Sequence, residues 1–340
     1  MRLIHFLGLI GAAIFVWIIY SIGLSQIIES LSMLDPFLFF IALLFFVPII
    51  ALKAVKQAML ANALSGRLSF FDSARIWLIG FFFSTISPGR SGDLLKSTYF
   101  VEKAGLQLGR GLTAVVVERF LDLVVLFLFG LLGFFVVSLY FILETSFLVP
   151  LFLAFVFFLA AAFAFTKKRI VLFLLLPFYR LFIPKKLKGK AQLGFHDFFE
   201  GIAVYRKRKM FLLKITGLTA LIWFIGITQY YFIALSLHMD VPFHYLFAMM
   251  PIIELLTILP IAFSGLGTRE AGLVFFLGLI GISAKTAVGF SLLILLTALL
   301  LACCGLACLR SEKKAKFDEK KAKPRGKKAK FGGKRAKPGS

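Results

Sequence analysis

The chain has 340 residues, of which 60% are hydrophobic and 16% aromatic, and its mean hydropathy is +0.96. A soluble domain does not have this balance, so the composition excludes a soluble enzyme and predicts an all-α integral membrane protein. The formal net charge of +23 is spread unevenly, because 14 Lys and Arg against three Asp and Glu lie from Arg310 onward.

Six apolar stretches are long enough to cross a bilayer. They are residues 3–20, 37–59, 112–140, 148–165, 212–237 and 284–309. No small-residue cleavage site follows the first, so we expect an uncleaved span. Lys and Arg gather after the second, fourth and sixth stretches, which predicts that the N- and C-termini are both cytoplasmic. We expect the protein in the cytoplasmic (inner) membrane of a prokaryotic cell.

A short apolar run, Ile76 to Ile86, ends in the sequence Ser87-Pro-Gly-Arg-Ser-Gly-Asp-Leu-Leu-Lys96. Irregular backbone and charge at membrane depth are tolerated only where protein or water surrounds them. Residues 76–105 therefore predict a re-entrant hairpin that enters and leaves on the cytoplasmic side. Its backbone relies on Pro88, Gly89 and Gly92.

Residues 243–282 show the same pattern near the other end of the chain. Pro251 and Pro260 interrupt an apolar run that carries Glu254, and the sequence Gly265-Leu-Gly-Thr-Arg-Glu270 follows. Gly265 and Gly267 allow close backbone approach and positive φ, and Thr268 is expected to cap the next helix. The topology requires this hairpin to enter from the outer side.

Two hairpins of opposite orientation form a pseudo-inverted repeat of the kind found in secondary transporters. We expect the hairpins to face each other and to form the functional site. The alternative is that the breaks are ordinary kinks and that one span is miscounted.

Three cations are the predicted ligands of an anionic head group: Arg90, Lys96 and Arg269. An arginine beside a helix N-terminus is suited to phosphate binding, because the backbone N–H groups and the guanidinium all donate. The predicted supporting carboxylates are Asp93, Glu118, Asp122, Glu254 and Glu270. The alternative for Arg90 and Asp93 is a purely structural ion pair that holds the hairpin shut.

Glu118 and Asp122 are four residues apart in a long apolar helix and therefore share one face, with Arg119 turned away from it. Two like charges on one face require a nearby cation, which Arg90, Lys96 or Arg269 could supply. Scaffold ion pairing and proton coupling through Glu118 or Asp122 both remain open.

Four scattered histidines and no nucleophile beside a base predict no catalytic residue, no metal site and no cofactor. Residues 311–340 repeat a Lys-rich heptad that contains Gly and Pro, which predicts a disordered polybasic tail after a membrane domain of residues 1–310. The tail is suited to an anionic lipid surface or a protein partner, and no specific nucleic acid is expected.

Three motifs, in order, resemble the flippase-like integral membrane family related to the transmembrane region of lysylphosphatidylglycerol synthases. They are Pro88-Gly-Arg-Ser-Gly-Asp-Leu-Leu-Lys96, Glu118-Arg-Phe-Leu-Asp122 and Gly265-Leu-Gly-Thr-Arg-Glu-Ala271, and the likeness covers roughly residues 1–310. Family members often have Glu and Arg where this chain has Asp93 and Lys96. The full synthases add a cytosolic aminoacyltransferase domain, and the chain has no soluble stretch of that size, so we do not expect an enzyme.

The resemblance implies movement of an anionic or modified phospholipid, or of a lipid-linked precursor, between leaflets. One alternative is a non-transporting membrane partner of an enzyme of polar-lipid or glycan synthesis. Another is an intramembrane lipid-modifying enzyme that uses Glu118 and Asp122 as acid and base.

Overall fold

The computed structural model describes residues 34–87, 90–140, 152–160, 188–258 and 267–322, together with four single residues between 20 and 32. The predicted first span and most of the fourth lie outside the described residues, as do Pro88, Gly89 and Gly265. Within the described ranges every regular element is a helix, which confirms the all-α prediction at that level.

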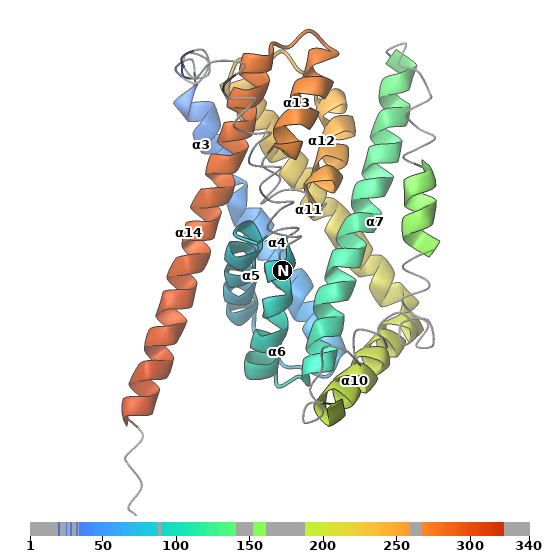
Figure 1. The fold of residues 1–340 in the computed structure, drawn as a ribbon, viewed down its shortest axis with the longest axis vertical. Coiled ribbons are helices and arrows are strands. Elements are labelled where there is room, and N and C mark those ends of the chain that lie inside the picture. Colours follow the sequence, from blue (N-terminus) through green and yellow to red (C-terminus); the bar gives the residue numbers. More distant parts are fainter. Residues whose placement is uncertain are drawn as a thin grey trace, which may run out of the picture.

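The elements follow one another in the order below (Figure 1). They are α3 (Pro36–Leu44), α4 (Phe46–Ala63), α5 (Phe70–Thr85), the 3₁₀ helix η1 (Ser91–Leu95), α6 (Lys96–Ala104), α7 (Leu108–Tyr140), α10 (Lys188–Lys207), α11 (Lys209–Ser236), α12 (Phe243–Ile258), α13 (Thr268–Gly278) and α14 (Ala284–Ala322). Residues 152–160 are also helical.

Three of the described helices are long and apolar enough to cross a membrane. They are the continuous pair α3 and α4 (Pro36–Ala63), α11 (Lys209–Ser236) and the Ala284–Lys314 part of α14. The first begins at Asp35, whose carboxylate accepts hydrogen bonds from the N–H groups of Phe37 (2.8 Å) and Leu38 (3.2 Å). This carboxylate fixes the helix start because it satisfies N–H groups that have no partner within the helix.

The first charged motif lies where α5 ends and η1 begins, and the two ends of this segment meet. The N–H of Arg67, before α5, donates to the carbonyl oxygen of Ala104, at the end of α6 (3.1 Å). Between them η1 lies against α5 so closely that a Cβ on Gly92 would be 2.2 Å from the carbonyl oxygen of Phe83. The chain therefore returns from this motif to the level at which it entered.

The second charged motif has the same arrangement at the opposite end of the molecule, where Figure 1 shows α12 and α13. The hydroxyl of Tyr245, near the start of α12, donates to the carbonyl oxygen of Phe276, near the end of α13 (2.5 Å). The beginning of α12 and the end of α13 are therefore adjacent. The motif between them lies deeper in the molecule.

Glycines allow the long helices to cross at short distance. A Cβ on Gly305 of α14 would be 2.2 Å from the carbonyl oxygen of Leu78 in α5, and a Cβ on Gly133 of α7 would be 2.4 Å from the Cα of Ala248 in α12. Each half of the molecule has its own apolar cluster. One joins α11, α12, α13 and α14, and the other joins α4, α6 and the first turns of α7.

Two segments differ from expectation. The predicted amphipathic helix is α10, and it packs on the start of α7, where Thr113 donates to the carbonyl oxygen of Phe198 (2.9 Å). Helix α14 extends to Ala322, so the first part of the predicted disordered tail is helical. Residues 311–322 contain helix-forming Lys, Glu and Ala and no Gly or Pro, and Glu312 pairs with Lys103 of α6 (3.2 Å).

Candidate functional site: a buried charge cluster beside a cavity

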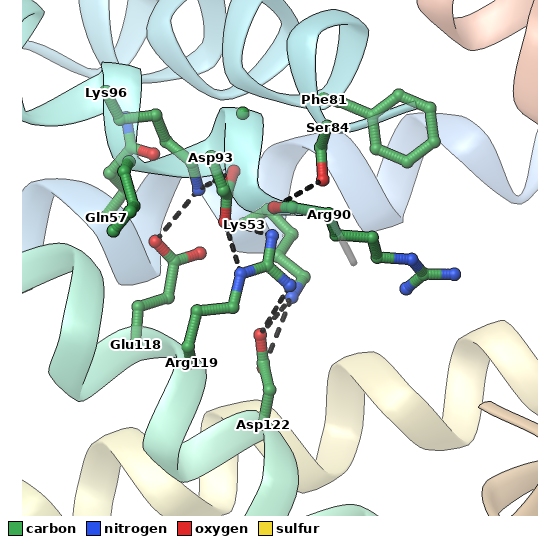
Figure 2. Close-up of polar contacts among 12 residues, drawn as sticks. Lys53, Gln57, Phe81, Ser84, Arg90, Asp93, Lys96, Glu118, Arg119 and Asp122 are labelled. Atoms are coloured by element: carbon green, nitrogen blue, oxygen red, sulfur yellow. Dashed lines mark hydrogen bonds and ion pairs between the residues drawn. The ribbon is translucent and has the colours of Figure 1, made fainter. Parts of the chain in front are cut away.

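Two lysines of α4 meet one aspartate of α7 inside the helix bundle. The ammonium of Lys56 is 2.7 Å from Asp122 Oδ1, and that of Lys53 is 3.2 Å from Asp122 Oδ2 (Figure 2). Asp122 is 3% exposed and Lys56 is fully buried. Charges at this depth persist only when they are paired and hydrogen-bonded, so the two helices are tied together at this point.

Lys96, at the start of α6, joins a second pair of carboxylates. Its Nζ is 2.9 Å from Asp93 Oδ1 and 3.1 Å from Glu118 Oε2. The carbon chain of Lys96 passes over Gly80 of α5, where an added Cβ would be 2.6 Å from Lys96 Cγ. Gly80 therefore provides the space through which this lysine reaches the cluster.

Arg119 connects the two groups. Its guanidinium donates to Asp93 in a very short contact, and its Nη1 is 3.8 Å from Asp122 Oδ2. The result is one continuous network of four cations and three carboxylates. Its members are Lys53, Lys56, Asp93, Lys96, Glu118, Arg119 and Asp122. The network carries one excess positive charge.

Arg90 extends from the first motif to the second half of the molecule. Its backbone has φ 54° and ψ 26°, a left-handed conformation that is uncommon for a residue with a side chain and is often found at functional sites. Its Nη2 is 3.0 Å from Glu254 Oε2 in α12. The other oxygen of Glu254 accepts a hydrogen bond from the hydroxyl of Tyr230 in α11 (2.7 Å).

Arg269 is held from two sides at the start of α13. Its Nη2 is 2.9 Å from Glu270 Oε1, and its Nε donates to the hydroxyl of Ser291 in α14 (2.8 Å). Ser291 in turn donates to Glu270 Oε1 (2.6 Å). Glu270 Oε2 also accepts from the N–H of Gly267, which caps the helix with φ 85°. Gly267, rather than the expected Thr268, is the cap because this φ requires glycine.

A cavity of about 170 Å³ lies among these groups. It is bounded by α4, α5, α11 and α14, with the two motifs at its ends. Its charged lining is Lys53, Arg90, Asp93, Arg119, Glu254 and Arg269, and its aromatic lining is Phe46, Trp77, Phe81, Trp223 and Tyr230. The ammonium of Lys53 lies 5.9 Å from the centre of the Trp223 ring.

The structure brings the predicted site residues together in part. Arg90 and Arg269, from the two motifs, line the same cavity, as do Asp93 and Glu254. Lys96 does not line it, because its Nζ is buried between two carboxylates. Glu118, Asp122 and Glu270 are likewise buried behind the wall. Lys96 alone of the three proposed cations reaches the Glu118–Asp122 face, since Arg90 and Arg269 pair elsewhere.

The sequence interpretation missed four residues that belong to this site: Lys53, Lys56, Arg119 and Tyr230. Lys53 and Lys56 were used only to orient the second span. Their position three residues apart inside a long apolar helix is itself a signal, because an ionisable residue within a span usually has a functional partner. Arg119 was expected to point away, but its long side chain reaches back to Asp93. Tyr230 carries no such signal.

One group of metal-ligand type occurs among the described residues, at His196, Asp197 and Glu200 of α10. It lies on the exposed end of the helix, and Glu200 already pairs with Arg110 (3.1 Å). Exposed groups of this kind are common without a metal, so they add nothing to the site.

The comparisons with known proteins give one match. Residues 6–305 match the family described as the lysylphosphatidylglycerol synthase TM region. No curated protein matches the chain. The family match and the long apolar helices agree that this is a membrane protein with a lipid-related role.

Proposed function

Because the chain belongs to the family of lysylphosphatidylglycerol synthase transmembrane regions, we propose that it moves an anionic or modified phospholipid between the leaflets of a membrane. The cavity lined by Arg90 and Arg269 is the observation that carries this proposal. It joins the two charged motifs, and its lining offers cations for a phosphate and aromatic surface for less polar groups.

Guanidinium groups are the expected ligands of a phosphodiester, because their parallel N–H groups match two phosphate oxygens. Three of them line the cavity: Arg90, Arg119 and Arg269. Lys53 adds a point charge on the side of α4. We assign Lys96 to a different task, since its ammonium is enclosed and fixes Asp93 and Glu118 in place.

The charge balance supports an anionic ligand. The seven-residue network has one excess positive charge, whereas Arg90 with Glu254 and Arg269 with Glu270 form neutral pairs. Excess charge in a low-dielectric site attracts the opposite charge strongly. A phosphodiester carries one negative charge and would neutralise this excess.

The cavity volume supports binding of the head group alone. A water molecule occupies about 30 Å³ in the liquid, so about 170 Å³ corresponds to roughly five or six waters. A phosphate with a small polar substituent fits such a space, and two acyl chains do not. The acyl chains would remain in the bilayer while the head group passes between the halves.

We further propose that residues 70–104 and 243–278 are re-entrant hairpins from opposite faces, among six full spans. The contacts of Arg67 with Ala104 and of Tyr245 with Phe276 support this, because each places the two ends of a hairpin together. Broken helices that meet at mid-membrane allow a fixed site to be reached alternately from either side.

Movement of fluorescent phosphatidylglycerol between leaflets of liposomes that contain the purified protein tests the proposal. We expect the wild type to accelerate movement, and Arg90→Ala and Arg269→Ala to abolish it. Arg67→Ala is the matched control, because Arg67 is an exposed arginine at the end of the first hairpin and does not line the cavity.

Two results would overturn the proposal. One is a wild-type protein that moves none of the tested phospholipids, with or without an ion gradient. The other is full activity in both arginine variants, which would separate the cavity from transport. The first result would favour a non-transporting partner of a lipid-synthesising enzyme, and co-purification of such an enzyme would then be the next measurement.

A further inference from the structure

Glu118 is a buried carboxylate that the proposed binding site does not itself use. It is 1% exposed, and Lys96 is the one described residue that bonds it, at Oε2. Its other oxygen, Oε1, is buried, and no described residue donates a hydrogen bond to it. A carboxylate at this depth with half of its hydrogen-bonding capacity unmet is costly in its ionised form.

The charge of Glu118 therefore depends on one neighbour, and that neighbour is shared. Lys96 Nζ lies between Glu118 Oε2 (3.1 Å) and Asp93 Oδ1 (2.9 Å). Asp93 is in turn bonded by Arg119, which is at the cavity wall with about a third of its side chain exposed. The bonds thus form a chain from the cavity through Arg119, Asp93 and Lys96 to Glu118 (Figure 2).

A phosphate in the cavity would act on the first member of this chain. Its oxygens compete with the carboxylate of Asp93 for the guanidinium of Arg119, because both are bidentate acceptors of the same N–H groups. Asp93, with less of Arg119, must draw more fully on Lys96. Glu118 then loses the one cation that bonds it, and a buried carboxylate without a partner takes up a proton.

We propose that binding of an anionic head group in the cavity is coupled to uptake of one proton by Glu118. The proton comes from water and forms an O–H bond on the Glu118 carboxylate, and no other bond is made or broken. One negative head group and one proton together add no net charge. The buried network therefore keeps the same excess charge when it is empty and when it is loaded. This inference rests on the proposed function and adds the ion that is transported with the lipid.

The groups that face Glu118 come from every helix packed around it. They are Lys53 and Lys56 of α4, Asp93 of η1, Lys96 of α6, Arg119 and Asp122 of α7, and Tyr205 of α10. Lys53, Lys56 and Arg119 bond Asp122, and Tyr205 donates its hydroxyl to the carbonyl oxygen of Leu60 (2.7 Å). Each of these groups is therefore bonded elsewhere, and Lys96 is the cation whose movement decides the charge of Glu118.

Calorimetric titration of wild-type protein in detergent with phosphatidylglycerol tests the coupling directly. The titration is repeated in buffers that differ in ionisation enthalpy, so that the difference in heat reports the protons exchanged. We expect uptake of about one proton for each lipid bound at neutral pH. Fluorescence of Trp77 and Trp223, which line the cavity, reports binding independently. This measurement requires no variant and does not depend on how a variant folds.

Glu118→Gln is the decisive variant, with Glu200→Gln as its matched control. Glu200 is an exposed carboxylate on α10. Glu118→Gln should bind the lipid without proton uptake, and Glu200→Gln should behave as the wild type. In liposomes, a pH difference of one unit should shift the leaflet distribution of the lipid about tenfold toward the less acidic side for the wild type, and not for Glu118→Gln.

The outcomes separate the two proposals. If the wild type binds and moves the lipid without taking up a proton, or if Glu118→Gln still takes one up, the coupling is wrong and the lipid transport stands. If the wild type neither binds nor moves phosphatidylglycerol, both proposals fail together.

Discussion

Arg90 and Glu254 are 164 residues apart in the sequence, and their side chains form an ion pair of 3.0 Å across the cavity. Arg90 comes from the first motif and Glu254 from the helix that precedes the second. Arg90 also adopts a left-handed backbone conformation to make this contact. The pair therefore joins the two halves of the molecule at the site where we propose that the head group binds.

Breaking this pair should affect stability in a coupled way. In Arg90→Ala the carboxylate of Glu254 keeps the hydroxyl of Tyr230, and in Glu254→Gln the guanidinium keeps its partial exposure to the cavity. Equilibrium unfolding in mixed micelles of both single variants and the double variant should give a coupling energy of about 0.5–3 kcal/mol. Simple additivity would show that the ion pair contributes nothing.

Lys96 should be a major contributor to stability. Lys96→Met removes the cation between Asp93 and Glu118 and leaves two buried carboxylates short of a partner, which should cost about 3–5 kcal/mol of unfolding free energy. Lys103→Met provides the comparison, because Lys103 lies on the surface of the same helix and pairs with Glu312. It should change the unfolding free energy by less than about 1 kcal/mol. Equal effects of the two changes would contradict the structure.

Gly92 should not tolerate a side chain. In Gly92→Ala the new methyl group would be 2.2 Å from the carbonyl oxygen of Phe83, so η1 must move away from α5 and take Asp93 with it. We expect lower thermal stability, by about 1–3 kcal/mol, together with loss of lipid movement. Gly217→Ala in α11 should be harmless or slightly stabilising, because nothing lies within 4 Å of the added carbon. The assay is a melting curve of each purified variant beside the liposome measurement.

The hydroxyl of Ser291 should matter for the placement of Arg269. Ser291→Ala leaves the buried Nε of Arg269 and one oxygen of Glu270 each short of a hydrogen bond, which should cost about 1–3 kcal/mol. Thr228→Ala removes a hydroxyl that bonds within its own helix, to Phe224, and should cost much less. A Ser291→Ala protein as stable as the wild type would show that the hydroxyl is not needed to hold Arg269.

The proposed topology predicts which side of the membrane each loop faces. In a protein whose three cysteines are replaced, Gln107→Cys should react with an impermeant thiol reagent from the cytoplasmic side only. Ser283→Cys should react from the opposite side only. Both positions are exposed, so burial does not interfere. Labelling of both from the same side would exclude oppositely oriented hairpins.

The sequence predicts much of the fold because composition and apolar length dominate in a membrane protein. The helix breaks at residues 86–95 and 259–267 were predictable from Gly, Pro and charge, and so was the charged face of Glu118 and Asp122. Their partners were only partly predictable. Lys53, Lys56 and Arg119 reach Asp122 through tertiary contacts across 66 to 69 residues and through long flexible side chains. Periodicity within one helix contains no information about such contacts.

The bonds of Lys53 and Lys56 to Asp122 also have a consequence for biogenesis. A lysine at the centre of a helix opposes insertion by the translocon by about 2.5–3.5 kcal/mol, so α4 is a poor substrate for insertion on its own. Its two lysines leave the ribosome 69 and 66 residues before the aspartate that bonds them. The segment that carries α4 must therefore wait beside the translocon until α7 arrives, and the two helices enter the lipid as a pair.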